Sequence, residues 1–376
     1  MNYLNINFQL KLKKVFRYLK LYGFKRTWIK IQGQRHLQTQ FTSLPKIRSK
    51  IKPKQRVAIV GCGNFAFTTI AYYLKKNFGN VIAGVMDINI NRAASLAHKY
   101  RVPVFSDNID DILKLEQVEL VFIASDHATH AEYAIKAIGK GKQVYIEKPH
   151  VVSERQLEAL YEIMNKNKPK VFLGFNRPVS RLGQLIFKYL NGQPGSGIYN
   201  WFVVGHKLEQ GHWYLNPEQG GRVLGNLCHW TDFILHLIPK DKIFPVEINP
   251  TRGAKKDSDI AVSFKFNDES IGVITFSEKG ETFEGVREKF NAQKGDCILT
   301  LDDFQKLTVD VGPEKIKYKL FHRDQGHEAN IVNAYKAVFR KDSYNYEQNY
   351  LHIYNTAKLF LKTKEALERN EKIIVM

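Results

Sequence analysis

The stretch RVAIVGCGNFAFTTI (56–70) decides the fold of the first half of the chain. It opens with a continuous apolar run that stops at Gly61, as expected for a strand buried on both faces of a parallel sheet. Gly61, Gly63 and Ala66 then form the pattern G-x-G-x-x-A, which leads into a helical segment. The first glycine allows a tight turn, the second lets the backbone approach a pyrophosphate, and the alanine permits close helix–strand packing. The stretch therefore predicts the phosphate-binding turn of a dinucleotide-binding domain.

The next predicted strand indicates which dinucleotide is bound. NVIAGVMD (80–87) ends in Asp87, 24 residues after Gly63. A carboxylate at this position accepts hydrogen bonds from both ribose hydroxyls and repels a 2′-phosphate, so we predict NAD. Arg92 lies close enough in sequence to keep NADP as an alternative. The residues predicted to bind the cofactor lie at or just after strand ends: Gly61, Gly63, Asn64, Phe65, Ala66, Asp87, Ser125, His130 and Glu147.

Strands and helices alternate through the first part of the chain and then stop alternating. VELVFIAS (118–125) and QVYIEKP (143–149) predict strands on either side of a helix at 130–141, which is typical of a doubly wound parallel sheet. After residue 170, short β segments follow one another without helices, and two helices near 325–340 and 345–369 close the chain. We expect an N-terminal doubly wound Rossmann domain followed by an open, antiparallel-rich β-sheet domain with helices on one face.

This pattern divides the sequence into four segments. They are a basic arm and linker (1–55), an NAD(P)-binding Rossmann domain (56–170), an α+β domain for substrate binding and oligomerisation (171–323), and C-terminal helices that pack back on the body (324–376).

Composition excludes several classes of protein. Of the 376 residues, 44% are hydrophobic and 12% aromatic, which rules out a disordered or low-complexity chain. No apolar run approaches the length of a membrane span, so we do not expect an integral membrane protein. Three widely separated cysteines give neither a disulfide framework nor zinc-ligand spacing. We therefore expect a reducing, cytoplasmic environment and no metal site.

The positive charge is concentrated at the N-terminus. The net charge of the chain is +20. Fourteen Lys and Arg residues lie within residues 1–55, and this segment contains no Asp or Glu. Within 10–31, apolar side chains recur at helical spacing among these cations. Such a helix can pack on its own body or a neighbouring subunit, lie on an anionic membrane surface, grip a polyanion, or serve as a transit peptide. Peripheral membrane contact through 10–31 stays open, and we do not expect nucleic acid as a partner.

Two longer motifs carry a resemblance to a known family. GCGNFA (61–66) together with ASDHATHAEYAIKAIGKGKQVYIEKP (124–149) resembles the Gfo/Idh/MocA oxidoreductases. Ser125, His130 and the tripeptide Glu147-Lys148-Pro149 match that family's motifs. GGRVLGNLCHWTDF (220–233) is similar to the branch of the family found with polysaccharide and sugar-nucleotide genes. The resemblance also implies a homodimer or homotetramer that buries one face of the second domain's sheet.

Alcohol oxidation requires a base for the hydroxyl proton and a cation or donor for the developing alkoxide. The family's lysine and histidine map onto Lys148 and His229, which we predict to be the cation and the base. Many members carry an aspartate where this chain has Gly225, so Asn226 is the predicted group that orients the imidazole. The predicted substrate residues combine cations, an aromatic ring and one carboxylate: Arg177, Arg222, Trp213 and Asp232.

We therefore predict an NAD(P)-dependent oxidoreductase that transfers a hydride between nicotinamide and a secondary alcohol or ketone of a sugar. A nucleotide sugar used in surface-polysaccharide biosynthesis is the expected substrate. Two alternatives stay open: a redox-neutral, NAD-dependent glycosidase, and a non-catalytic dinucleotide-binding sensor or regulator.

Overall fold

The computed structural model describes residues 7–46, 50–205, 211–254, 258–278, 285–340 and 343–376. The chain folds into two compact units, and each is assembled from separated segments. The α/β unit combines Phe24–Gly174 with Glu328–Tyr354, and the sheet unit combines Met1–Gly23, Phe175–His327 and Asn355–Met376. The chain passes from one unit to the other at Gly174, close to the predicted boundary at 170, whereas the segment 324–376 is shared between both units.

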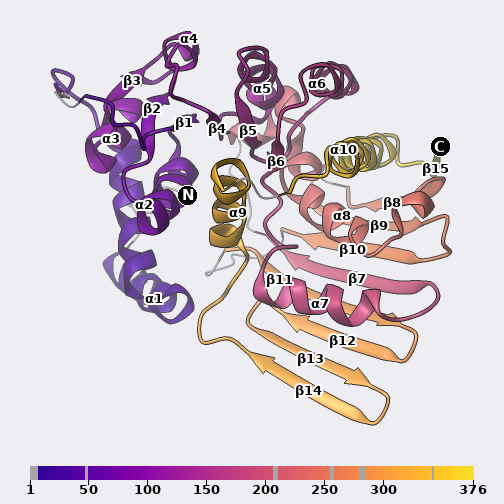
Figure 1. Cartoon of the computed structure of the whole chain (residues 1–376). Coiled ribbons are helices and arrows are strands. Elements are labelled where there is room, and N and C mark those ends of the chain that lie inside the picture. The colour runs from indigo at the N-terminus through magenta and orange to yellow at the C-terminus, as the bar shows by residue number, and fades with distance from the viewer. Residues whose placement is uncertain (1–6, 47–49, 206–210, 255–257, 279–284, 341–342) are drawn as a thin grey trace. The chain divides into compact units, whose positions relative to one another are not determined.

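The α/β unit is built on a six-stranded sheet in the order β3-β2-β1-β4-β5-β6, in which every pairing is parallel. Its strands are β1 (Val57–Val60), β2 (Ile82–Met86), β3 (Val104–Ser106), β4 (Leu120–Ile123), β5 (Gln143–Ile146) and β6 (Val171–Leu173). The strand order reverses between β1 and β4, and in such sheets ligands bind beyond the carboxyl ends of the strands at this point. Figure 1 shows these strands framed by helices.

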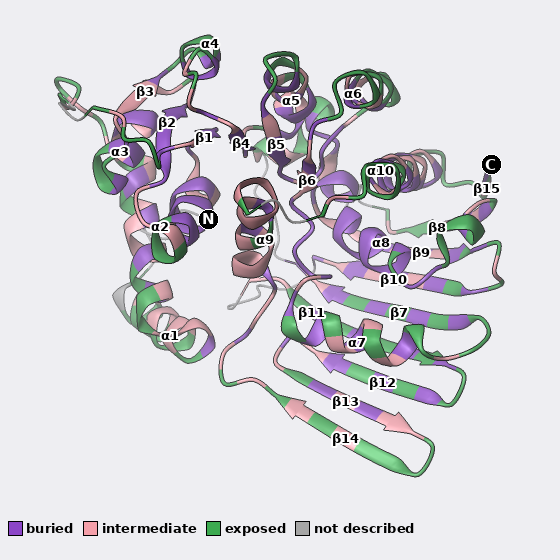
Figure 2. Cartoon of the chain, viewed as in Figure 1, coloured by how far each residue is buried: buried purple, intermediate pink, exposed green. Residues whose placement is uncertain are grey.

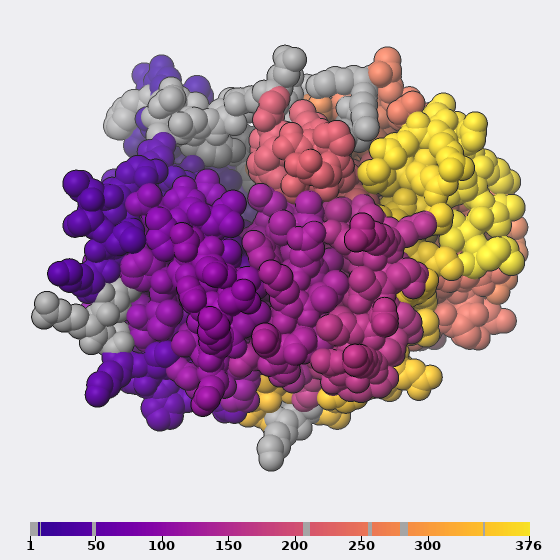
Figure 3. Space-filling model, turned by 90° about the horizontal axis from the view of Figure 1, so that it is seen from above, coloured from indigo at the N-terminus to yellow at the C-terminus, as the bar shows by residue number. Residues whose placement is uncertain are grey.

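The helices of this unit cover the sheet because both of its faces are apolar. A short π-helix (Ala66–Ile70) opens the first of them, directly after the glycine-rich loop. Besides the second part of the N-terminal helix, the unit contains α2 (Ala71–Phe78), α3 (Ile90–Tyr100), α4 (Ile109–Leu113), α5 (His130–Gly139), α6 (Glu154–Asn167), α9 (His327–Phe339) and the start of α10 (Tyr346–Arg369). In Figure 3, the purple and magenta segments, which include α4, α5 and α6, form a continuous outer surface.

The sheet unit contains nine strands in the order β14-β13-β12-β11-β7-β10-β9-β8-β15. Only β7 and β10 pair in parallel, and the other pairings are antiparallel. The strands are β7 (Gly197–Val204), β8 (Val246–Arg252), β9 (Asp259–Lys265), β10 (Ile271–Ser277), β11 (Arg287–Lys294), β12 (Cys297–Asp302), β13 (Lys306–Val311), β14 (Glu314–Lys319) and β15 (Ile373–Val375). Two helices of this unit are α7 (Arg181–Asn191) and α8 (Cys228–Leu235).

One face of the nine-stranded sheet is buried and the other is open, as the alternating colours of β7 and β12 show (Figure 2). On the buried face, the Phe233 ring of α8 lies 5.1 Å from that of Trp201 and 5.4 Å from that of Phe290. Phe187 of α7 lies 4.8 Å from Phe233 and completes this aromatic core. The two halves of the predicted fold class, a doubly wound domain and an open sheet with helices on one face, are confirmed.

The basic arm forms helix α1 (Phe8–Gln38), which is longer than the predicted 10–31 and bends at Gly23, where φ is +76°. Its two parts pack on different units. Leu21 and Arg323, both in the sheet unit, are joined by a backbone hydrogen bond of 2.9 Å, and Ile29 lies in the core of the α/β unit. Packing on the chain's own body is therefore confirmed for part of the helix, although Phe16 remains 68% exposed.

The sequence patterns gave no signal for five of the strands. These are β3, β6, β8, β13 and β15. Three of the five have only three residues, too few for alternation or an apolar run to stand out. Among the described residues, no helix combines the length and hydropathy that crossing a bilayer requires.

Candidate active site

The glycine-rich loop follows β1 and has the geometry that its sequence predicted. Gly61 has a φ of +85°, and a Cβ there would lie 2.5 Å from the carbonyl of Ala124 and the amide of Ser125. Only glycine fits this turn. Gly63 differs, because no described atom lies within 4 Å of the position a Cβ would take. The loop is tight on the side of β4 and open over Gly63, which leaves room for a pyrophosphate close to the backbone.

Asp87, at the end of β2, is tied to this loop. Its Oδ2 accepts a hydrogen bond of 2.7 Å from the Cys62 amide, and its Oδ1 accepts one of 2.8 Å from the Asn89 amide. Each oxygen keeps a lone pair for a further donor. A carboxylate fixed beside an open glycine loop fits the ribose of NAD, so the residues present fit this cofactor.

Three predicted cofactor residues of the loop have side chains that pack against the protein itself. The Asn64 amide oxygen lies against Gly33 of α1, where an added Cβ would come within 2.3 Å of it. Phe65 packs against the hydrophobic core of the unit, as a partly buried ring, and Ala66 is fully buried. The backbone of these residues, rather than their side chains, is available to a ligand.

His130 connects the ends of β4 and β5. Its Nδ1 lies 2.8 Å from the Pro149 carbonyl and its Nε2 lies 3.0 Å from the Ser125 carbonyl. Burial lowers the pKa of His130 to about 4, against the opposing effect of these two carbonyls. A neutral imidazole carries one N–H, so it donates to only one of the carbonyls at a time. The ring links the Ser125 turn to the turn that carries Lys148.

Glu147 and Lys148 lie near the end of the predicted strand 143–149. The Tyr145 hydroxyl donates a hydrogen bond of 3.0 Å to Glu147 Oε1, and Gly174 lies so close that its Cβ would reach within 2.6 Å of Glu147 Oε2. Glu147 is thus buried and engaged by its neighbours, whereas Lys148 is only partly buried.

In the sheet unit, His229 is paired with Arg177. Its Nε2 lies 3.0 Å from Arg177 Nη1, and Phe175 meets the imidazole edge-on at 5.8 Å. A guanidinium only donates, so Nε2 is the acceptor and the neutral ring carries its proton on Nδ1. This contact fixes the tautomer of the predicted base.

Arg177 is itself held by a buried carboxylate. Its Nε donates to Glu288 Oε1 at 3.0 Å, and the same glutamate accepts hydrogen bonds of 2.8 Å from Trp230 and from Gln325. The Arg177 and Glu288 side chains are 8% and 0% exposed. The positive charge of Arg177, which was predicted to bind substrate, is therefore neutralised by Glu288, and its guanidinium contacts His229.

Sequence reasoning did not identify Glu288, although a signal was present. In β11, Glu288 shares the inward-facing phase with Phe290 and Ala292, and all three are buried. A carboxylate in the apolar phase of a strand indicates a buried partner, because an unpaired buried charge is strongly disfavoured.

Two other predicted residues of this unit, Arg222 and Asn226, lie in the segment just before α8. Asn226 Oδ1 accepts a hydrogen bond of 3.4 Å from Arg222, and Arg222 forms a buried ion pair of 2.8 Å with Glu278. A π-helix over Val223–Leu227 precedes α8 and displaces Asn226 from the regular helical phase. The structure therefore gives Asn226 a different partner from the predicted imidazole.

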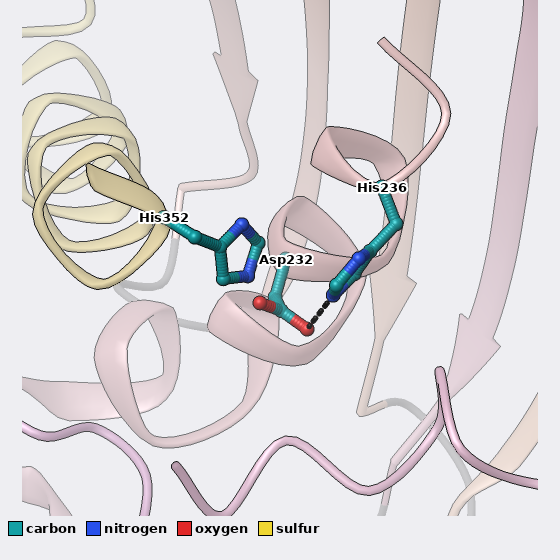
Figure 4. Close-up of side chains that lie close together, drawn as sticks. All are labelled: Asp232, His236 and His352. Atoms are coloured by element: carbon teal, nitrogen blue, oxygen red, sulfur yellow. Dashed lines mark ion pairs between the residues drawn. The ribbon is translucent and has the colours of Figure 1, made fainter. Parts of the chain in front are cut away.

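Asp232 and Trp213 lie in contrasting environments. Asp232 is fully buried, accepts a hydrogen bond of 3.4 Å from Thr356, and forms an ion pair of 3.7 Å with His236, which is shown in Figure 4. Trp213 is 39% exposed and meets Tyr214 edge-on at 4.4 Å.

Comparisons with known proteins agree with this geometry. Residues 55–175 match the profile of GFO_IDH_MocA, described as "Oxidoreductase family, NAD-binding Rossmann fold". An inositol 2-dehydrogenase of Serratia proteamaculans is 26% identical over 208 residues, 53% of this chain and 59% of that protein. A glucose-6-phosphate 3-dehydrogenase of Bacillus subtilis is 27% identical over 295 residues, 76% of this chain and 79% of that protein. The chain spans only 37 to 59% of the length of some curated relatives that it matches.

A solved structure extends the likeness in fold to both units. Levoglucosan dehydrogenase in complex with NADH and levoglucosan superposes with a TM-score of 0.72 at 15% identity, and the match covers 85% of this chain and 98% of that one. Residues 55–175 therefore match the NAD-binding Rossmann fold of the Gfo/Idh/MocA oxidoreductase family.

Proposed function

We propose that the chain is an NAD-dependent oxidoreductase that transfers a hydride between nicotinamide and a secondary alcohol or ketone of a sugar. The main supporting observation is the hydrogen bond between the Cys62 amide and Asp87, which sets a ribose-binding carboxylate beside the open glycine loop. When bound, the nicotinamide ring supplies the hydride acceptor or donor.

The chain's own residues manage the charge and the proton. Lys148 is the cation that steadies a developing alkoxide. His229 accepts the hydroxyl proton at Nε2 once the substrate hydroxyl takes the position now held by Arg177 Nη1. Glu288 keeps the rest of the guanidinium in place during this exchange, because it binds Arg177 through Nε. Before substrate binds, Arg177 fixes the tautomer of the imidazole, whereas Asn226 contacts Arg222.

The expected substrate is a sugar or a polyol, since relatives are named for inositol, glucose 6-phosphate and levoglucosan. We propose a nucleotide sugar of surface-polysaccharide synthesis as the narrower assignment. Arg177 and Arg222 are each neutralised by a buried glutamate, so they offer little net charge to a phosphate. The exposed ring of Trp213 and the partly buried ring of its neighbour Tyr214 support the assignment, because they suit stacking on a sugar ring or a base.

The test follows NADH absorbance with NAD or NADP and a panel of nucleotide sugars, myo-inositol, glucose 6-phosphate and levoglucosan. The variants are His229→Ala and Lys148→Met, with His98→Ala on the exposed side of α3 as the matched control. We expect NADH formation with one substrate, lost in the first two variants and kept in the control. A signal that survives His229→Ala contradicts the assigned roles.

The same experiment distinguishes two other functions from the proposed one. Cleavage of a glycoside without net NADH formation favours a redox-neutral glycosidase. Tight NADH binding with no turnover of any substrate favours a dinucleotide sensor or regulator.

We also propose that the chain forms a homodimer or homotetramer through the open face of its nine-stranded sheet. Ile198 and Phe202 of β7 and Ile298 of β12, the strands on either side of β11, are each at least half exposed, which is unusual for large apolar side chains on one face of a sheet. A second copy covers such a face symmetrically. Phe202→Lys is expected to yield monomers in light scattering, and an unchanged mass rejects this interface.

For α1 we propose contact with anionic membranes. Phe16, exposed in the sheet unit, is flanked by the exposed cations Lys13 and Arg17, a combination that suits the lipid interface. Sedimentation with phosphatidylserine vesicles is expected to fall in Phe16→Ser, with neutral vesicles as the control. Equal sedimentation of the variant and the wild type rejects the proposal.

A further inference from the structure

Residues 24–41 pack directly on the glycine-rich loop and on the helix that follows it, and they precede the 55–175 region that matches the family profile. His36 makes the central contact. Its Nε2 lies 2.7 Å from the Cys62 carbonyl, its Nδ1 lies 2.9 Å from the Ser95 hydroxyl, and its ring stacks on Phe67 at 4.2 Å. The side chain is only 3% exposed.

The chemistry of these partners fixes the imidazole in one form. A carbonyl oxygen only accepts, so the proton lies on Nε2, and Nδ1 accepts from the Ser95 hydroxyl. Both ring nitrogens are satisfied by the neutral ring. Burial also lowers the pKa of His36, which favours the same neutral form.

Two further contacts hold α1 close to the dinucleotide helix. Gly33 approaches so closely that an added Cβ would lie 2.3 Å from both Asn64 Oδ1 and Thr68 Cγ2. About two turns earlier in the helix, the Arg26 guanidinium donates a hydrogen bond to the Thr68 carbonyl within the π-helix. The same guanidinium lies over the rings of Tyr72 and Tyr73, at 5.1 and 4.8 Å.

The peptide groups on either side of Cys62 are therefore held by side chains from two different segments of the chain. The Cys62 amide donates to Asp87, and the Cys62 carbonyl accepts from His36. Cys62 lies between the two glycines of the loop, whose backbone would otherwise be among the most mobile parts of the chain. His36 also connects this loop to Ser95 on α3.

We propose that residues 24–41 are part of the dinucleotide-binding apparatus, and that His36 is a positioning residue that fixes the Gly61–Ala66 loop for the pyrophosphate and Asp87 for the ribose. The proposal rests on the proposed function, since it assigns a role toward the same cofactor. His36 makes no contact with the dinucleotide in this assignment and acts through Cys62.

The test compares substitutions that retain different parts of the His36 contact. His36→Gln can place an amide N–H where Nε2 donates to Cys62, whereas His36→Asn is too short to reach it. His36→Phe keeps the ring that stacks on Phe67 and removes both hydrogen bonds. Gln38→Ala, at an exposed position of the same helix, is the matched control. NADH affinity is measured by fluorescence titration, and thermal unfolding is measured without dinucleotide.

We expect the Kd for NADH to rise about tenfold in the Asn and Phe variants, equivalent to ~1.4 kcal/mol, and to stay near the wild-type value in the Gln variant and the control. Rescue by Gln at equal thermal stability separates positioning from a general loss of structure. If the Asn or Phe variant does not fold, the test compares the NADH affinity of the Gln variant with that of the wild type and of Gly33→Ala. The Gly33→Ala substitution forces α1 away from Asn64.

Unchanged NADH affinity in folded Asn and Phe variants overturns the proposal, as does equal weakening by Gln and Asn. The proposed function fails in a different way, because its failure shows as absent turnover in the wild type, whereas failure of this proposal shows in the NADH affinity of the His36 variants.

Discussion

The buried pair of Arg177 and Glu288 leads to a quantitative prediction about the sheet unit. With side chains 8% and 0% exposed, neither charge can be solvated when its partner is removed. Breaking a buried pair from one side typically costs about 3–5 kcal/mol, so we expect Arg177→Met and Glu288→Gln each to destabilise the unit by that amount. Glu288→Gln also disturbs two further hydrogen bonds, from Trp230 and Gln325, which places it at the upper end.

The double variant distinguishes a charge effect from a simple loss of packing. Arg177→Met with Glu288→Gln removes both charges, so we expect it to recover ~2 kcal/mol or more relative to the sum of the single changes. Unfolding in urea is followed by tryptophan fluorescence, since Trp201, Trp213 and Trp230 all lie in the sheet unit. Three of the chain's four tryptophans therefore report this transition.

An exposed ion pair of the same types provides the control. Arg56 and Glu119 in the α/β unit have side chains 42% and 43% exposed. A pair in this environment contributes about 0–1 kcal/mol, so Arg56→Met should change stability little. Our reasoning about Arg177 is refuted if its replacement costs less than ~1 kcal/mol, or if the double variant loses the full sum of the two single effects.

Three further predictions concern the α/β unit. Because the folded-state pKa of His130 is about 4 against 6.5 unfolded, its contribution to stability is complete above pH 6.5 and is lost as the pH falls to 4. The loss is about 3 kcal/mol, and urea unfolding should show it in the wild type but not in His130→Phe. Gly63→Val should leave thermal stability unchanged, since described atoms leave that space open, yet weaken NADH binding at least about tenfold; equal affinity in fluorescence titration would contradict the site. Asp87→Asn should lower the ratio of the Kd for NADPH to that for NADH about tenfold, because it removes the charge that repels a 2′-phosphate. An unchanged ratio argues against ribose binding by Asp87.

The α/β sheet could be predicted because its determinants are local. A continuous apolar run, a glycine at a tight turn and a carboxylate at the next strand end are all read from short stretches around Gly61 and Asp87. The three-residue strands β3 and β6 carry too little sequence for such signals. Their pairing depends on neighbouring strands that are already in place.

The partners of the predicted site residues were harder to infer, because they come from distant segments. Arg177 and His229 lie 52 residues apart, and Arg177 and Glu288 lie 111 apart. The resemblance to the family suggested Asn226 as the partner of His229, but Asn226 lies in the π-helix before α8 and its amide oxygen accepts from Arg222. The contact of His36 with Cys62 joins a segment with no acidic or motif residue to the loop, and no pattern within either segment indicates it.

The interleaved composition of the two units also determines when each can be completed during synthesis. Residues 24–174 leave the ribosome early, yet their unit requires Glu328–Tyr354, which follow only after most of the sheet unit. Until then the Leu173 carbonyl lacks the Asn330 amide that donates to it at 3.0 Å, and the Val171 carbonyl lacks the Tyr344 hydroxyl at 2.7 Å. A nascent chain thus carries an unfinished β6 edge through much of its translation. Slow or interrupted elongation between 175 and 327 should therefore expose this edge to chaperones or to misassembly.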